Sequence, residues 1–389
     1  MAAVVAHRGL SGLYPEQTAT AHTAAANAGA DSLEADLHMS KDCVLVARHN
    51  AWLSDSTTIA AVAQTNAQVA ARKRTVPGVK VDVDYSVAAY GGPAQHLSDL
   101  ADPTNSKSVL KSLVVDGEDH TGDWSISDFT AAELKQWLAG TTYDARDERP
   151  GELNGKLPTL TMQEIIDIAK AKSATTGRTI TVYPKVENPY WNNAQARANG
   201  CGSGAHPFED ALLKLVRDNN LNSKTAPIFV QSFDPASLKY LRAAGLATRV
   251  VQLIDGNDIN FQTGEMLTPA GLAEIKTYAD GIGPWKPQVM AHRIVPFRQT
   301  NANGTPYTST LAEVNTVSPT SVIADAHKAG LFVHVFTFRN ERKCLAGVYQ
   351  GDPAQEYLAY YRAGVDGVFT DFTPTAVAAR AAYLRETGR

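Results

Sequence analysis

Short runs of β-branched and aliphatic residues recur along the chain, and segments with helical spacing lie between them. The runs predict strands at Val4–His7, Asp31–Leu37, Val44–His49, Thr179–Tyr183, Pro227–Val230, Arg249–Ile254, Asp280–Ile282, Leu331–Phe336 and Gly367–Asp371. The intervening segments predict helices at Gln17–Ala28, Met162–Ala171, Phe208–Asp218, Pro235–Ala244, Pro319–Ala329 and Ala354–Ala363. Several of these helices end in a glycine just before the next strand, as helix C-termini commonly do, at Gly29, Gly245, Gly330 and Gly364.

Alternation of strand and helix implies a parallel sheet. If the run at Val44–His49 pairs back on its predecessor as a hairpin, eight parallel strands remain. Eight strand–helix units predict an α/β fold of the TIM (β/α)8 barrel type that takes in residues 1–389. A doubly wound open sheet is the alternative, but no GxGxxG follows the first strand, which weakens it.

One stretch, about residues 51–155, breaks this rhythm, because it is polar and holds few clear strands. Insertions of this length are usually functional lids or small subdomains, so we expect an inserted subdomain over the barrel mouth. The alternative is a disordered surface excursion. The apolar residues Trp52, Trp124, Ile126 and Phe129 favour the ordered lid.

Composition limits the classes of partner. The 389 residues include 36 Lys and Arg against 40 Asp and Glu, without a long basic run, so we expect neither nucleic acid nor a polybasic membrane contact. No apolar run approaches the roughly 18 residues of a membrane span. The three cysteines form no CxxC pair and allow at most one disulfide, which leaves the compartment open. The chain start lacks the pattern of a leader, so a cytoplasmic protein and one whose leader is removed both stay possible.

Chemistry is expected where barrel strands end. Glu34 and Asp36 are two apart on one predicted strand and therefore share a face. Two carboxylates on one inward face repel unless a cation or proton lies between them, and hard oxygen ligands suit Ca²⁺ or Mg²⁺. The alternative is a solvated strand face.

Two histidines also lie at strand ends. His7 and His49 are candidates for a general acid and base, because imidazole titrates near neutral pH. Arg8 offers a bidentate fork for phosphate or carboxylate, although an ion pair with Glu16 is the structural alternative.

Aromatic residues near later strand ends are candidates for a leaving-group pocket: Phe233, Trp285, Phe336 and Phe338. Trp285 is suited to stack on a choline-like cation. The alternative is that these rings cap the barrel core.

The order of these motifs resembles the glycerophosphodiester phosphodiesterase family. The resemblance is carried by His7-Arg8-Gly9, Pro15-Glu16-Gln17-Thr18, Gly29 to Asp36, Ser40-Lys41-Asp42, His49, Asp116 to His120, Tyr183-Pro184, Gln231-Ser232-Phe233, Asp280 to Pro284, Thr337 to Asn340 and Gly364 to Asp371. It implies a TIM barrel with an inserted small domain that hydrolyses glycerophosphodiesters to glycerol 3-phosphate and an alcohol, commonly with Ca²⁺ or Mg²⁺. It further implies that His7 and His49 are the acid/base pair, that Arg8 contacts the phosphate, and that Glu34 and Asp36 hold the metal. The later segments look most like a longer, often secreted or periplasmic bacterial branch, which favours that localisation.

The chain departs from the family pattern at two places. It has Asn50 where the family has Asp, and Lys185-Val186-Glu187 where the family has Glu-x-Lys, whose Glu is the third metal ligand. The acid and the base have exchanged positions, about 7 Å apart along a strand. We therefore expect metal affinity to be weakened, moved or lost.

Three hypotheses follow. In the first, the protein is a metal-dependent phosphodiesterase in which Glu187 reaches the ion from a shifted position. In the second, Lys185 replaces the ion, and the altered enzyme acts on another phosphoester or a diphosphate, with a cyclic product as one outcome. In the third, the chain binds phosphoesters without turnover, which the intact His7 and His49 argue against.

Overall fold

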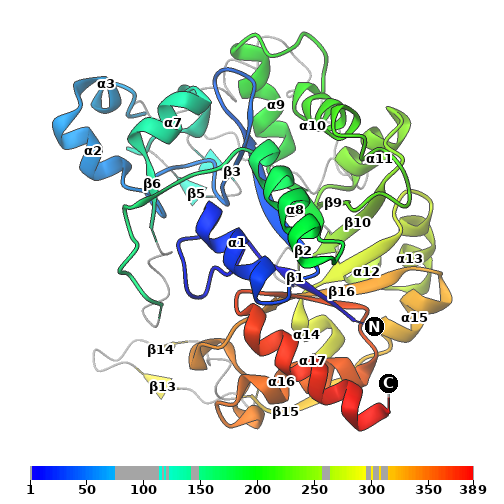
Figure 1. Cartoon of the computed structure of the whole chain (residues 1–389). Coiled ribbons are helices and arrows are strands. Elements are labelled where there is room, and N and C mark those ends of the chain that lie inside the picture. Colours follow the sequence, from blue (N-terminus) through cyan, green and yellow to red (C-terminus); the bar gives the residue numbers. More distant parts are fainter. Residues whose placement is uncertain are drawn as a thin grey trace.

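A closed ring of eight parallel strands forms the centre of the protein (Figure 1). The computed structural model describes residues 2–74, 114–115, 118–119, 122–141, 149–255, 263–294, 299–300, 306–307 and 314–388. The ring strands are β1 (Ala3–Ala6), β2 (Ser32–Met39), β8 (Thr181–Val186), β9 (Phe229–Ser232), β10 (Arg249–Ile254), β11 (Gly281–Pro284), β16 (Phe332–Phe338) and β17 (Gly367–Thr370). Pairing of β1 with both β2 and β17 closes the ring, which confirms the predicted barrel.

Helices surround the ring. They are α1 (Ala19–Asn27), α8 (Met162–Thr176), α9 (Pro189–Ala198), α10 (Pro207–Asp218), α11 (Pro235–Ala243), α12 (Thr263–Met266), α13 (Pro269–Lys276), α14 (Lys286–Val289), α15 (Val322–Lys328), α16 (Pro353–Ala363) and α17 (Thr373–Thr387). The four glycines predicted to end helices all have positive φ, between 78° at Gly330 and 100° at Gly29. Each helix therefore ends where the left-handed backbone of glycine turns the chain back toward the sheet.

The predicted hairpin is present. Strand β3 (Leu45–Ala47) pairs antiparallel with the last residues of β2, with Ala47 opposite Leu37. The backbone N–H of Arg48 then donates to the carbonyl of Asp36 over 2.9 Å. The hairpin thus returns the chain to the mouth of the barrel at His49.

Aromatic residues fill the barrel interior below that mouth. Tyr183 stacks on Phe229 with ring centroids 4.8 Å apart, and it meets the edge of Phe369 at 5.0 Å. Its hydroxyl lies 3.1 Å from Nδ1 of His334. Tyr183 and Phe369 lie two positions before Lys185 and Asp371, so alternation along the strands sets them one layer beneath these polar residues. The aromatic layer is the floor of the site.

The described part of the insertion has its own apolar cluster. Its elements are α2 (Ile59–Thr65), α3 (Ala67–Ala70), β4 (Val114–Val115), β5 (Glu118–Asp119), the 3-10 helix η1 (Ile126–Asp128), α7 (Ala131–Trp137), β6 (Ala139–Gly140) and β7 (Leu157–Pro158). Helices α2, α3 and α7 gather at one side of the barrel (Figure 1). Trp52, Trp124, Ile126 and Phe129 pack in this cluster together with Trp191 of α9. The boundaries at about 51–155 and the role as a lid stay predictions, since part of the stretch lies outside the described residues.

Further short elements follow β11. They are the antiparallel pair β12 (Met290–Ile294) and β15 (Val314–Pro319), the pair β13 (Gln299–Thr300) and β14 (Pro306–Tyr307), and the 3-10 helices η4 (Arg342–Cys344) and η5 (Gly347–Tyr349). No helix in the described ranges combines the length and the hydropathy that crossing a bilayer requires.

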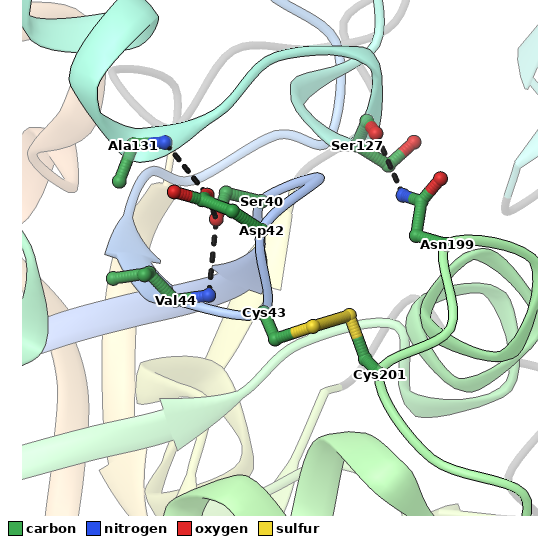
Figure 2. Close-up of a disulfide and its surroundings, with 8 residues drawn as sticks. All are labelled: Ser40, Asp42, Cys43, Val44, Ser127, Ala131, Asn199 and Cys201. Atoms are coloured by element: carbon green, nitrogen blue, oxygen red, sulfur yellow. Dashed lines mark hydrogen bonds between the residues drawn. A yellow bond between two sulfur atoms is a disulfide. The ribbon is translucent and has the colours of Figure 1, made fainter.

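A disulfide ties the hairpin to the helical layer (Figure 2). Cys43, in the β2–β3 turn, bonds Cys201, which follows α9, with Cα atoms 5.3 Å apart. Beside it, Asp42 accepts a hydrogen bond from the backbone N–H of Ala131, the first residue of α7, over 2.8 Å. The hairpin, α9 and the insertion therefore meet at one corner. Cys344 is not part of this disulfide, so the structure has the single disulfide that three cysteines allow.

Candidate active site

The ends of three neighbouring strands bring the predicted polar residues to one mouth of the barrel. β1 leads into His7 and Arg8, β2 carries Asp36, and β8 carries Lys185. The strand register sets Asp36 directly opposite Lys185, and Lys185 in turn opposite Gln231 of β9. Parallel pairing thus assembles residues that are more than 100 positions apart in the sequence into one layer.

Arg8 is buried and fixed by acids on several sides. Its backbone N–H donates to Glu34 Oε2 over 2.8 Å. Its side chain lies 2.9 Å from Asp36 through Nε and 3.0 Å from Glu16 through Nη1. The alternative pairing with Glu16 therefore exists alongside the contact with Asp36. The backbone enters this arrangement through a left-handed turn, with φ of 60° at Arg8, and Gly9 follows where a Cβ would lie 2.7 Å from the backbone of Ala21.

Glu34 and Asp36 are both buried, so neither belongs to a solvated strand face. Burial, followed by the neighbouring Asp36, raises the pKa of Glu34 well above its usual value. Burial also raises the pKa of Asp36, but Arg8 and Lys185 outweigh it and hold that pKa well below the usual range. The two pKa values therefore shift in opposite directions, so a proton is held more firmly at Glu34 than at Asp36.

Lys185 lies between two acids. Its Nζ is 3.3 Å from Asp36 Oδ1 and 2.6 Å from Glu187 Oε2. The ammonium also lies over the ring of Phe233, 4.7 Å from the centroid. Burial lowers the pKa of Lys185, but Glu187 and Asp36 outweigh it and raise that pKa above its usual value, so the side chain is a fixed cation.

His7 is held by Asp371, the residue after β17. The distance from His7 Nδ1 to Asp371 Oδ1 is 2.6 Å. Arg149 and Arg339 contact the other carboxylate oxygen, Arg339 through Nε over 3.0 Å. Burial, followed by Arg8, lowers the pKa of His7 to about 4, while Asp371 opposes that shift. His7 is therefore neutral at pH 7.

The sequence does not predict the network behind His7. It places Asp371 only at the end of the predicted strand Gly367–Asp371, without a role. Arg149 was missed, although it contacts Asp371 and also lies 2.6 Å from Glu341 through Nε. No local signal could have found it, since Arg149 and Asp371 are 222 residues apart.

His49 lies in the same electrostatic environment. Its carbonyl oxygen is 3.1 Å from Nε2 of His38, which fixes the backbone after β3. Burial, followed by Arg8, lowers the pKa of His49 well below its usual value, and Asp36, Lys185 and His7 also act on it. The charges that perturb His49 are those of the site itself.

The donor set does not fit Ca²⁺ or Mg²⁺. Among the residues that the structure describes, no three His, Cys, Asp or Glu side chains are grouped so that they could hold a metal ion. The predicted ligands Glu34, Asp36 and Glu187 have Lys185 among them, paired with two of the three. The Asn50 side chain, at the other departure from the family pattern, donates to Asp55.

The aromatic candidates divide into two groups. Phe338 is buried in the core and stacks on Tyr357 with ring centroids 4.8 Å apart. This agrees with the alternative that the ring packs in the barrel core and does not line a pocket. Phe233 and Phe336 are only half-buried and meet edge-to-face at 5.8 Å. Trp285 is half-buried as well and forms a backbone bridge with Phe336.

The sequence profile of the glycerophosphoryl diester phosphodiesterase family matches residues 7–375. The chain belongs to this family. It is an enzyme, a phosphoric diester hydrolase, as the resemblance implied.

Individual relatives agree with this assignment. The chain is 31% identical to glycerophosphodiester phosphodiesterase GDPD6 of Arabidopsis thaliana over 95% of its length and 83% of the relative's. It is 24% identical to the glycerophosphodiester phosphodiesterase of Haemophilus influenzae over 96% and 88% of the two chains. A crystal structure from Silicibacter pomeroyi shares the fold with a TM-score of 0.59 at 16% identity, covering 100% of this chain and 94% of the other. The solved structure of an Oleispira antarctica phosphodiesterase, in complex with sn-glycerol 3-phosphate, has a TM-score of 0.51 at 16% identity and covers 97% of this chain and 96% of the other.

Proposed function

We propose that the protein hydrolyses glycerophosphodiesters to glycerol 3-phosphate and an alcohol, with His7 and His49 as the acid/base pair. The observation that carries the proposal is the hydrogen bond between His7 and Asp371 beside the cluster of Arg8, Asp36 and His49. The names of the relatives support the substrate class.

His7 is assigned as the base. The 2.6 Å contact with the ionised Asp371 makes Nδ1 the donor, so Nε2 carries a lone pair that can accept a proton. When it does, Asp371 stabilises the imidazolium. The depressed pKa keeps the ring in its basic form at neutral pH.

His49 is assigned as the acid. In the free enzyme, burial and Arg8 disfavour its protonated form. A phosphodiester anion brings negative charge beside it, which raises its pKa and supports a protonated ring in the complex. Arg8 holds a phosphate oxygen, and its pairs with Glu16 and Asp36 fix its position in advance.

The reaction runs in two balanced steps. In the first, His7 takes the proton of a neighbouring substrate hydroxyl, whose oxygen bonds phosphorus, while the leaving alkoxide takes a proton from His49; a cyclic phosphate results. In the second, His49 takes a proton from water, the hydroxide opens the ring, and His7 returns its proton to the departing oxygen. Release of the cyclic phosphate before the second step is the alternative outcome.

The alcohol is assigned to the aromatic side of the mouth. Phe233 and Trp285 are half-buried. The Lys185 ammonium lies over the ring of Phe233. We expect Trp285 to stack on a cationic headgroup such as choline. Trp285→Ala should then raise KM for glycerophosphocholine more than for glycerophosphoglycerol, whose headgroup carries no cation, and an equal rise would remove this assignment.

We further propose that the protein works in an oxidising compartment, secreted or periplasmic. The Cys43–Cys201 disulfide supports this, because structural disulfides persist in such environments. Free thiols at both positions in protein isolated from its own cells would contradict the proposal. We also propose that the substrate is a small molecule and that the protein does not act on nucleic acid.

The function is tested by ³¹P NMR of glycerophosphocholine with wild-type protein, His7→Ala and His49→Ala. The proposal expects glycerol 3-phosphate, or a cyclic phosphate before it, from the wild type and loss of turnover in both variants. His327→Ala is a matched control, because His327 lies at the surface in an exposed pair with Asp366. Turnover in His7→Ala equal to that of this control would refute the proposal.

A further inference from the structure

The place of Lys185 is set by strand register. Its Cα lies opposite Asp36 on one side and opposite Gln231 on the other. Gln231 donates to Glu34 Oε1 over 3.1 Å. A residue at this position therefore borders both carboxylates of β2, whatever its charge. In the family pattern an acid stands here, whereas this chain has a base.

The carboxylates that would bind an ion are already occupied by donors of the chain. Glu34 accepts from the Arg8 backbone over 2.8 Å and from Gln231. Asp36 accepts from Gln17 over 3.1 Å and pairs with Arg8 and Lys185. Ca²⁺ takes about six to eight oxygens at roughly 2.3–2.6 Å, which these carboxylates could supply only by giving up several of their partners.

Glu187 completes the exchange of charges. Its Oε2 lies 2.6 Å from Lys185 Nζ, so the two residues that are exchanged relative to the family form an ion pair with each other. Lys185 is only 7% exposed and stays charged through Asp36 and Glu187. The Lys185 ammonium is therefore a cation of the chain itself at the place where the family pattern implies a bound metal ion.

We propose that Lys185 takes over the role of the divalent ion, so that this enzyme binds and turns over its phosphodiester without a metal; the proposal rests on the hydrolysis proposed above. The ammonium and the Arg8 guanidinium approach different oxygens of Asp36, at 3.3 Å and 2.9 Å, so the two cations lie side by side. An ammonium has three N–H donors, and the proposal assigns one of them to a phosphate oxygen beside Arg8. Lys185 and Arg8 then share the negative charge of the phosphate in the transition state.

The first test is metal binding, which needs no turnover. Calcium is titrated calorimetrically into the chelator-treated full chain and into the double exchange Lys185→Glu, Glu187→Lys, which keeps the net charge. The proposal expects no saturable heat from the wild type up to about 1 mM Ca²⁺, the weak end of protein calcium sites, and at least about tenfold tighter binding by the exchange variant. Stoichiometric binding by the wild type, or no gain in a folded exchange variant, overturns it.

The second test is turnover of glycerophosphocholine with and without EDTA. The wild type should be insensitive to EDTA, and Lys185→Met should lose about 10²- to 10³-fold in kcat/KM without recovery on adding Ca²⁺. Lys239→Met is the matched control, because Lys239 is exposed and pairs with Glu274 on the surface. EDTA inhibition that Ca²⁺ reverses, or full activity of Lys185→Met, overturns the proposal.

The two proposals fail separately. If the wild type turns over no glycerophosphodiester under any condition, the proposed function is wrong, while the calcium titration still decides whether Lys185 occupies the place of the ion. If the exchange variant does not fold, as judged by circular dichroism, the titration of the wild type and the activity of Lys185→Met remain decisive.

Discussion

Replacing Asp371 with Asn tests the assignment of His7 as the base. The substitution keeps the shape of the side chain but removes the charge that faces His7 Nδ1 at 2.6 Å. A hydrogen bond to a charged group contributes about 1.5–3 kcal/mol. An ion pair with charge centres about 4 Å apart contributes about 4 kcal/mol at an effective dielectric constant of 20.

These two values describe overlapping parts of one interaction, so the imidazolium that forms during the reaction loses about 3–4 kcal/mol of stabilisation. That loss corresponds to a fall of about 10²- to 10³-fold in kcat, with little change in KM because Arg8 still holds the phosphate. The assay is steady-state hydrolysis of glycerophosphocholine at a temperature well below the Tm of the variant.

The pH profile separates this role from a merely structural one. In the wild type, the acid limb of kcat/KM should lie near the His7 pKa of about 4. Asp371 raises that pKa, so the substitution should move the limb to lower pH. Asp366→Asn is the matched control, since Asp366 pairs with His327 at the opposite end of β17. A kcat for Asp371→Asn equal to that of this control, or an unshifted limb, would show that Asp371 does not act through His7.

Three further predictions concern other parts of the molecule. Arg8→Lys should reduce kcat/KM by about 10²-fold, because one ammonium cannot replace the fork that contacts two carboxylates, and kinetics at constant pH would check this. Cys43→Ser should lower the free energy of unfolding by about 2–4 kcal/mol, because the disulfide closes a loop with a sequence separation of 158. Denaturant unfolding with and without reductant measures this loss of stability, and an unchanged midpoint would count against a structural role of the disulfide. Burial lowers the pKa of His22 to about 3, so the folded state binds fewer protons than the unfolded state between about pH 6.5 and 3, and stability falls as the pH falls through this window. His22→Leu should flatten the dependence of the unfolding free energy on pH there by up to about 1.4 kcal/mol per pH unit, as urea titrations at several pH values would show.

The sequence revealed the parts of the fold that depend on local pattern. Strand alternation, the hairpin and the glycines that end helices were all readable, because each rests on residues close in sequence. The meeting of Lys185 with Asp36 was also predictable. Both lie at strand ends, and parallel neighbours bring such ends to one mouth.

Other features depend on tertiary structure. Helix α9 was missed because it buries polar residues, among them Asn192 and Asn193, so it lacks an apolar stripe. Phe338 was expected at the mouth because it lies near the end of a predicted strand. The register of β16 against β17 shifts between Val335 and Phe338, and Phe338 lies in the core.

A crystal structure of the full chain with sn-glycerol 3-phosphate, grown without divalent ions, would show whether the two imidazoles meet at one phosphate. We expect phosphate oxygens within about 2.6–3.2 Å of both the His7 and the His49 ring nitrogens, with Arg8 and Lys185 on the remaining oxygens. A phosphate bound away from this mouth, or one that only a single imidazole reaches, would contradict this expectation.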